Sequence, residues 1–317
     1  METVSVIIPV YNRAGCIQRC LESVFAQTYP AIEVIVVDDG STDELETVLS
    51  PLMSKIKFVR QDNQGQGAAR NAGARIASGR YLAFLDSDDW WAAEKIFQQM
   101  ASIKKSGCVW SHMKTLVVSS EVGESAIEKG YFGDWYRGQR SGMITQELLQ
   151  TNFICTSSVL IEKMVFINSG GFCVNRSLQR FEDYELWLQL AARYPIDYCE
   201  IPAVYYVSHE AVSAFDEVIE QIEKNDLVMD SIANKCAEIY PSDAITRRRY
   251  FFREHLFRVA ISQNNRKTAR HILEEMRYFN GFIGSNLLNT LLYFTPHCIF
   301  KRIGLFIARL SKPQESG

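Results

Sequence analysis

The sequence lacks a long apolar run of the kind that crosses a membrane. Its longest stretch without an acidic or basic residue, residues 278–300, is interrupted by asparagine, proline and histidine, whereas a spanning helix needs about 20 predominantly apolar residues. The first residues also lack the charged segment, apolar core and cleavage site of a secretory signal peptide. We therefore expect a cytoplasmic chain without a spanning helix.

Paired cysteines and the common nucleotide-binding loops are missing as well. The eight cysteines are scattered and none forms a Cys-x-x-Cys pair, which is typical of reduced cytosolic thiols rather than of a disulfide framework. No glycine-rich loop ends in Gly-Lys-Ser/Thr, and Gly65-Gln66-Gly67 does not continue a strand as a dinucleotide-binding loop does. These absences argue against a P-loop enzyme and against a Rossmann dehydrogenase.

Charge is unevenly distributed along the chain. Residues 1–246 carry 33 acidic and 21 basic residues, whereas the residues from Arg247 onward carry 4 acidic and 13 basic ones. A basic tail suggests an anionic partner, but no nucleic-acid-binding motif accompanies it, so we expect no nucleic acid. Residues 299–310 place lysine and arginine among isoleucine, leucine and phenylalanine. This segment has two interpretations: an amphipathic helix on an anionic membrane surface, or a helix packed on the protein with a solvated basic face.

Apolar runs of strand length alternate with helical segments over the first 92 residues. Most of these runs are nearly all apolar, which indicates strands buried on both faces. Such strands, alternating with helices, predict an α/β fold with a mostly parallel central sheet and helices on both faces. The predicted strands are residues 4–10, 32–37, 56–59 and 81–85, and the predicted helices are residues 15–27, 42–53 and 67–77.

The rest of the chain is less regular, and its pattern becomes helical beyond residue 215. One hydrophobic core rarely extends past about 250–300 residues. We therefore expect an α/β domain of residues 1–214 and a helical C-terminal region of residues 215–317. Further predicted elements are strands at residues 152–161 and 203–207 and a helix at residues 183–193, whereas residues 106–142 show no clear period.

Polar clusters directly follow three of the predicted strands: Tyr11-Asn12, Asp38-Asp39 and Asp86-Ser87-Asp88-Asp89. In an open α/β sheet, ligands bind outside the carboxyl ends of the strands. Asp86 and Asp88 stand two residues apart at such an end, so both can reach one hard divalent cation whose remaining positions stay open for phosphate oxygens. The alternative is a solvated loop in which Asp89 caps a helix near Trp90.

The clusters occur in a recognisable order. Pro9-Val10-Tyr11-Asn12 ends the first strand, Val37–Asp43 reads VDDGSTD, and Gly67–Gly73 reads GAARNAG before the acids at 86–89. Together they resemble the signature of family 2 glycosyltransferases over residues 3–92, and the resemblance continues in pieces to about residue 213. It implies the GT-A fold and an inverting, metal-dependent transfer of a sugar from a nucleotide diphosphate sugar to an acceptor hydroxyl. UDP is the expected nucleotide, and Mn²⁺ or Mg²⁺ the expected cofactor.

The same resemblance bears on the acceptor and on location. Members of the family commonly act on a glycan or a lipid-linked acceptor, so we expect a role in cell-surface polysaccharide or lipid-linked glycan synthesis. A lipid-linked acceptor would place the protein peripherally on the inner face of the cell membrane. None of the five tryptophans follows an arginine, so the Gln-x-x-Arg-Trp motif of processive synthases is absent and we expect transfer of single residues.

The resemblance also implies roles for individual residues. Tyr11 and Asp39 match residues that hold the nucleobase, and Asp88 matches the metal ligand. His209 lies in a segment similar to one near the metal and the diphosphate, although Val207 stands where many members carry arginine. The residues expected to bind the donor are Pro9, Tyr11, Asp39, Arg70 (beside the nucleotide), Asp86 (near the ribose and sugar) and Ser87. Without this context, Arg70 would be taken for a helix-surface arginine with an ion pair.

Glu182-Asp183 resembles the Glu-Asp motif of the family, whose aspartate acts as general base. An inverting transfer needs one carboxylate to take the acceptor hydroxyl proton, and such a base contributes about 10²–10⁴ in rate. Asp183 is therefore the predicted base. The alternative interpretation is that both acids only favour a helix N-terminus electrostatically.

Two other functions compete with sugar transfer. A sugar nucleotidyltransferase would need a glycine-rich loop with arginine and lysine after the first strand, where Pro9–Gly15 reads PVYNRAG. A catalytically inactive nucleotide-sugar-binding or scaffold protein of the same fold is the second alternative. The presence of Asp86, Asp88 and Asp183 argues against it.

Overall fold

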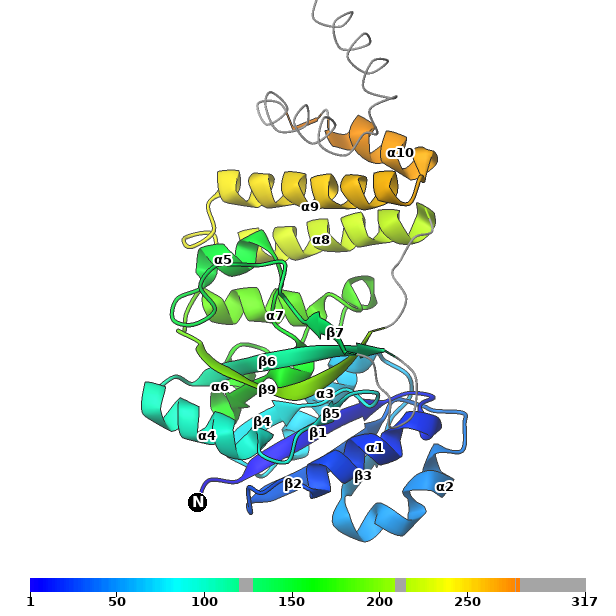
Figure 1. The fold of residues 1–317 in the computed structure, drawn as a ribbon, viewed down its shortest axis with the longest axis vertical. Coiled ribbons are helices and arrows are strands. Elements are labelled where there is room, and N and C mark those ends of the chain that lie inside the picture. The colour runs from blue at the N-terminus through cyan, green and yellow to red at the C-terminus, as the bar shows by residue number, and fades with distance from the viewer. Residues whose placement is uncertain (120–127, 209–214, 277, 280–317) are drawn as a thin grey trace, which may run out of the picture. The chain divides into compact units, whose positions relative to one another are not determined.

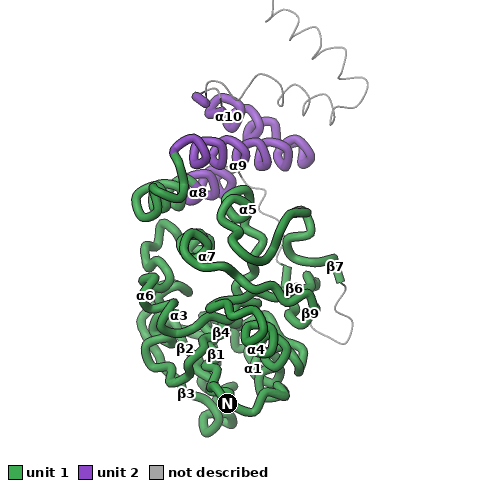
Figure 2. The backbone as a smooth tube through the Cα atoms, turned by 90° about the vertical axis from the view of Figure 1, so that its left-hand side faces the viewer, with its two compact units in different colours: residues 1–211, 226–241 green, residues 212–225, 242–317 purple. Residues whose placement is uncertain are grey.

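The computed structural model describes residues 1–119, 128–208, 215–276 and 278–279. These divide into two compact units (Figure 2), one of residues 1–211 with 226–241 and one of residues 212–225 with 242–317. The predicted boundary at residue 214 stays a prediction. His209 and residues 299–310 lie outside the described residues. No helix in the described ranges is both long and apolar enough to span a membrane.

The first half of the larger unit is a parallel sheet in the strand order β3-β2-β1-β4. Every residue of β1 is buried, as its unbroken apolar run predicts for a strand covered on both faces. The strands are β1 (Val4–Val10), β2 (Ile32–Asp38), β3 (Lys57–Arg60) and β4 (Tyr81–Phe84).

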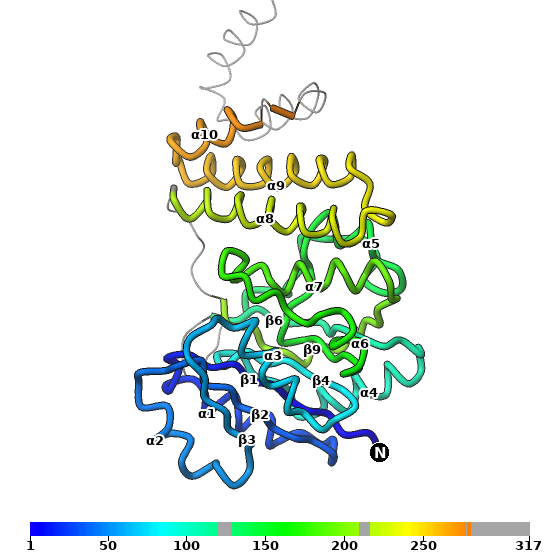
Figure 3. Tube along the Cα trace, turned by 180° about the vertical axis from the view of Figure 1, so that it is seen from behind, coloured from blue at the N-terminus to red at the C-terminus, as the bar shows by residue number. Residues whose placement is uncertain are grey.

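Helices cover both faces of this parallel half (Figures 1 and 3). Helix α1 (Ala14–Phe25) packs its apolar stripe on the face of β1 that carries Val6 and Ile8. Helix α3 (Gln66–Ile76) lies on the opposite face. There a Cβ on Gly73 would stand 2.6 Å from a methyl group of Ile7, so the second glycine of GAARNAG lets the helix approach the strand. Between β2 and β3 run the short helix α2 (Leu45–Leu49) and the 3₁₀ turn Ser50–Lys55.

The second half of the sheet is mixed rather than parallel. Beyond β4 the order continues β8-β6-β9-β5, with β7 beside β6; only β6 and β9 are parallel neighbours. The strands are β5 (Trp90–Trp91), β6 (Trp110–Ser119), β7 (Glu128–Tyr131), β8 (Leu160–Glu162) and β9 (Asp197–Ser208). The helices are α4 (Lys95–Ser106), α5 (Thr145–Gln150), α6 (Lys163–Asn168) and α7 (Glu182–Ala191).

Two predicted strands and one unassigned region differ from the structure in this half. The predicted strand at 152–161 is mostly a buried irregular segment with the 3₁₀ turn Thr156–Ser158, and only its end belongs to β8. An apolar composition alone does not distinguish the two, because a buried irregular segment is as apolar as a buried strand. The region without a clear period contains the ten-residue strand β6, whose residues are buried on both faces and therefore do not alternate. The predicted strand at 203–207 is the end of the longer β9.

The smaller unit is helical, as predicted. It contains the first part of α8 (Phe215–Lys235), α9 (Ser242–Ser262) and α10 (Arg266–Met276). Apolar side chains including Ile222, Phe257 and Ile272 form its own core. Arg253 Nε and Glu275 Oε2, 2.9 Å apart, join α9 to α10.

Candidate active site

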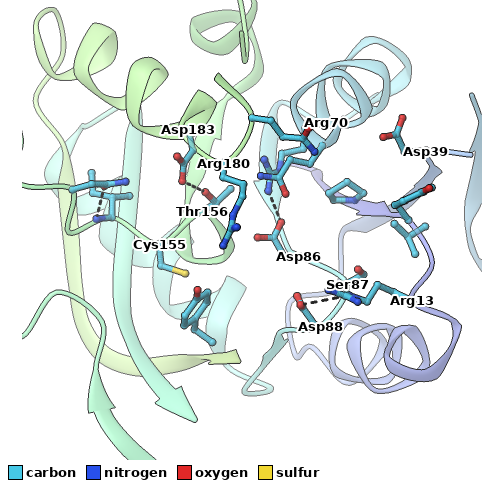
Figure 4. Close-up of a pocket in the computed structure, with 18 of the residues that line it drawn as sticks. Arg13, Asp39, Arg70, Asp86, Ser87, Asp88, Cys155, Thr156, Arg180 and Asp183 are labelled. Carbon is cyan, nitrogen blue, oxygen red and sulfur yellow. Dashed lines mark hydrogen bonds and ion pairs between the residues drawn. The ribbon is translucent and has the colours of Figure 1, made fainter. Parts of the chain in front are cut away.

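A cavity of ≈ 1060 Å³ opens at the carboxyl ends of the parallel strands. This is where ligands bind in open α/β sheets. Its other wall comes from the mixed half of the sheet and from the start of α7, so residues far apart in the sequence face one another (Figure 4). Eight of the nine predicted site residues line this one cavity: Pro9, Tyr11, Asp39, Arg70, Asp86, Ser87, Asp88 and Asp183.

The acidic turn after β4 is fixed by a chain of hydrogen bonds. The backbone N–H of Asp86 donates to the Ser157 hydroxyl at 3.0 Å, and that hydroxyl donates to Asp89 Oδ2 at 2.5 Å. Asp89 Oδ1 accepts from the Val207 N–H at 2.8 Å. The suggested role of Asp89 as a helix cap near Trp90 is therefore wrong. Trp90 begins strand β5, and Asp89 is a buried carboxylate that ties the acidic turn to the end of β9.

Arg70 is the buried link between the acidic turn and α7. Its guanidinium donates from Nη2 to Asp86 Oδ1 at 2.6 Å and from Nη1 to Glu182 Oε1 at 2.9 Å. Only 1% of Arg70 is exposed, so the interpretation as a surface arginine is wrong. A Cβ on Gly67 would stand 3.1 Å from Glu182 Cγ, so the first glycine of GAARNAG makes room for this pair. Burial raises the pKa of Asp86, and the charge of Arg70 opposes that rise.

The two acids at the start of α7 have different surroundings. Glu182 is buried against Arg70, whereas Asp183 lines the cavity. The Thr156 hydroxyl donates to Asp183 Oδ2 at 2.8 Å, and the Tyr184 N–H donates to Oδ1 at 2.6 Å. Burial, together with the charge of Glu182, raises the pKa of Asp183 to about 7. A carboxylate with that pKa can exchange a proton near neutral pH, which a helix-stabilising acid does not require.

Asp39 is held by the loop that follows β3. Its Oδ1 accepts from Gln61 Nε2 at 2.7 Å and from the Gln64 N–H at 2.9 Å, and its Oδ2 accepts from the Gly65 N–H at 2.7 Å. The carboxylate therefore orders the approach to α3 as well as lining the cavity. Tyr11, directly after β1, also lines the cavity and is 48% exposed.

Asp88, the predicted metal ligand, lies at the wall of the cavity. Its Oδ2 lies 3.8 Å from Arg13 Nε at the cavity wall. Across the ranges that the structure describes, no three histidine, cysteine, aspartate or glutamate side chains come together as a metal cage. Mg²⁺ in phosphate-transfer sites is commonly bound by one or two carboxylates, with substrate phosphates and water supplying the other ligands. The Asp88 carboxylate at the cavity wall is compatible with such a site, and its role as a metal ligand stays a prediction.

Several cavity residues were not predicted from the sequence. They come from the mixed half of the sheet or from the loop before α7: Phe132, Asn152, Ile154, Cys155, Thr156, Arg176, Gln179, Arg180 and Tyr206. Their position depends on how β6, β8 and β9 pair, which no local pattern encodes. Arg180, two residues before Glu182, is the one that the Glu-Asp motif could have drawn attention to.

The profile of Glycosyl transferase family 2 matches residues 5–170, just over half of the 317 residues. An uncharacterized glycosyltransferase of Rickettsia felis is 33% identical over 193 residues, which cover 60% of this chain and 30% of that protein. The Escherichia coli protein named UDP-Glc:alpha-D-GlcNAc-diphosphoundecaprenol beta-1,3-glucosyltransferase WfaP is 31% identical over 195 residues, which cover 61% of this chain and 72% of that protein. The chain thus spans less than a third of the length of the Rickettsia relative.

Solved structures of Staphylococcus aureus TarS share the fold. Residues 1–349 of TarS in complex with UDP-GlcNAc match with a TM-score of 0.63 at 20% identity, covering 86% of this chain and 80% of that chain. The complex of the same TarS residues with UDP matches with a TM-score of 0.58, covering 81% of this chain and 72% of that chain. The predicted GT-A fold with a helical C-terminal region is thereby confirmed. With the family profile over more than half of its length, the chain belongs to glycosyl transferase family 2.

Proposed function

We propose that the protein is an inverting glycosyltransferase that moves a sugar from a nucleotide diphosphate sugar, with UDP as the nucleotide, to an acceptor hydroxyl. The observation that carries the proposal is the position of Asp183. Its carboxylate, with a pKa raised to about 7, lines the same cavity as the acids of the turn after β4. A proton acceptor and a candidate phosphate-binding turn thus face one space.

The donor would lie along the wall built by the parallel strands. Tyr11 would stack on the nucleobase, and Asp39, which lines the same cavity, would accept a hydrogen bond from it. Pro9 and Ser87 line the same cavity, and Asp86, held against Arg70, is the residue expected near the sugar. The name of the WfaP relative specifies UDP-Glc, and TarS was crystallised with UDP-GlcNAc. Both support UDP as the nucleotide.

Asp183 would act as the general base. The acceptor oxygen attacks the anomeric carbon while its proton passes to the Asp183 carboxylate, and the bond from that carbon to the diphosphate oxygen breaks with its electron pair. The Thr156 and Tyr184 hydrogen bonds hold the carboxylate in place for this transfer. Preorganisation of this kind avoids reorganisation at the moment of reaction.

Asp88 would hold Mn²⁺ or Mg²⁺ together with phosphate oxygens of the donor. His209, in the segment after β9, stays a predicted second contact. When bound, the ion would neutralise charge on the leaving diphosphate.

The acceptor would be a glycan or a lipid-linked sugar. The WfaP name specifies a sugar diphosphate-linked to undecaprenol as acceptor, which supports a lipid-linked acceptor and a place on the inner face of the cell membrane. Asn152 and Phe132, which line the cavity from the mixed half of the sheet, are the expected contacts of the acceptor.

A thermal-shift screen of nucleotide sugars with Mn²⁺ tests the proposal. A ligand that binds only the folded state stabilises it by RT ln(1 + [L]/Kd), about 2.7 kcal/mol at 100 times Kd. We expect a UDP-sugar to raise the melting temperature and to be hydrolysed or transferred over hours. A shift with no turnover, across a panel of acceptors, would favour the inactive binding protein. No shift with any nucleotide diphosphate would refute both.

A further inference from the structure

Arg180 enters the cavity from a backbone conformation that arginine rarely adopts. Its φ is +76°, in the left-handed region that glycine populates freely and residues with a Cβ avoid. The Arg180 N–H donates a 2.6 Å hydrogen bond to Glu182 Oε2, while the other oxygen of Glu182 accepts from Arg70. The unfavourable conformation is therefore held in place by the buried Arg70–Glu182 pair.

The Arg180 side chain points into the space where the reaction would occur. Figure 4 shows its guanidinium between Asp183 and Thr156 on one side and Asp86 on the other. Among the described residues, the guanidinium makes no hydrogen bond and no ion pair within the protein, although carboxylates lie on both sides of it.

The other arginines of the cavity wall are engaged. Arg13 lies 3.8 Å from a carboxylate oxygen of Asp88, and Arg70 has its two buried carboxylates. Arg176 donates to the Asn63 side-chain oxygen at 2.8 Å. Arg180 is thus a cavity cation with its donors available to a ligand.

A strained backbone conformation persists only where the surrounding structure holds it. Such residues cluster at active sites and ligand-binding sites. A planar guanidinium fork suits a phosphate, which it can bind through two parallel hydrogen bonds. In the proposed reaction the diphosphate gains one negative charge as its bond to the anomeric carbon breaks. A fixed cation beside that bond would stabilise the gained charge.

We propose that Arg180 binds a phosphate oxygen of the donor diphosphate, on the side of the cavity opposite Asp88. This inference rests on the proposed function. It makes Arg180 a donor-binding residue in addition to those that the family signature implies.

Arg180→Gly tests the role without a folding penalty, because glycine adopts a φ of +76° more readily than arginine. The measurement is calorimetric titration of the full-length protein with UDP in the presence of Mn²⁺, alongside NMR titration with uridine. We expect UDP affinity to fall about 10- to 100-fold, the range for a lost charged hydrogen bond, while uridine affinity stays within twofold. Arg180→Lys should give an intermediate loss, since it keeps the charge and loses the fork.

Asn264→Gly is the matched control. Asn264 also has a positive φ, +55°, is exposed and is not among the residues of the cavity wall. It should leave UDP affinity unchanged, and neither glycine variant should lower the melting temperature.

Unchanged UDP affinity in Arg180→Gly would overturn the proposal, even if the KM for the acceptor rose. An equal loss for UDP and uridine would also overturn it. If the wild-type protein itself bound no UDP, the proposed function would fail instead, so the two failures are distinguishable.

Discussion

The Thr156 hydroxyl donates a 2.8 Å hydrogen bond to Oδ2 of Asp183. Thr156 begins a short 3₁₀ turn just before β8, and Asp183 lies in the first turn of α7. A hydrogen bond to the charged form of a carboxylate lowers its pKa, and here it opposes the rise caused by burial and by Glu182. The proton affinity of the proposed base is thus set partly by a residue of the irregular segment before β8.

Removing this hydrogen bond should shift the pH dependence of transfer. The base must be deprotonated, so wild-type kcat/KM should rise with pH through the pKa of about 7. Thr156→Val removes the hydroxyl that donates to Asp183 and so raises the pKa of Asp183 further. The rising part of the curve of kcat/KM against pH should then move to higher pH. Thr156→Ser keeps the hydroxyl and should leave the rising part in place. The measurement is kcat/KM against pH at saturating metal, and a rising part unmoved in Thr156→Val would contradict this account of the pKa.

Arg70 should be essential to the stability of the fold. Arg70→Met leaves Asp86 and Glu182 without the cation that both contact, and breaking a buried ion pair from one side costs about 3–5 kcal/mol. Urea unfolding measures this loss, and the double variant with Glu182→Gln should recover part of it. Arg75→Ala, at an exposed position of the same helix, is the control and should change stability by less than about 0.5 kcal/mol. Equal stability of Arg70→Met and Arg75→Ala would contradict the assignment.

Asp89 should stabilise the fold through the end of β9 rather than through a helix. Burial together with Asp86 and Asp88 raises the pKa of Asp89. Asp89→Ala leaves the Val207 N–H without its acceptor, at a cost of about 1–3 kcal/mol, whereas Asp89→Asn keeps a carbonyl for it and should cost less. Urea unfolding of both variants checks the order. Asp62→Ala, at an exposed loop position, should be nearly neutral, and an Asp89→Ala variant as stable as that control would count against this role.

Elements and motifs that depend on neighbouring residues could be predicted from the sequence. Contacts between residues far apart in the chain could not. The unbroken apolar run of β1 predicted a strand covered on both faces, and residues 67–77 were predicted as a helix, which the structure has as α3. The close packing of that helix at Gly73 was not predicted.

Separate roles for the acids after β4 could be predicted only from the family signature. The role predicted for Asp89 was wrong because its partners, Ser157 and Val207, lie 68 and 118 residues away in the sequence. Thr156 was missed because its partner at the cavity, Asp183, lies 27 residues away in the sequence. Arg180 was missed although its backbone partner, Glu182, is only two residues away, because a single loop arginine carries no pattern of its own.

Asp88 should couple nucleotide binding to a divalent ion. Titration with UDP should show tighter binding with Mn²⁺ than with EDTA, because the ion would bridge the carboxylate and the phosphates. Asp88→Asn removes the charge of that ligand with little change in shape, so it should lose most of the metal-dependent gain while binding uridine as before. If Mn²⁺ increased the UDP affinity of Asp88→Asn as much as that of the wild type, Asp88 would not be a metal ligand.

The role of Asp183 as base is the central claim, and Asp183→Asn tests it most directly. Asparagine keeps the size of the side chain and can still accept from Thr156, but it cannot take a proton from the acceptor. Turnover of the UDP-sugar identified by thermal shift should fall by about 10²–10⁴, and calorimetry should give a UDP affinity in the presence of Mn²⁺ within about twofold of wild type. Turnover at the wild-type rate in Asp183→Asn would contradict the claim.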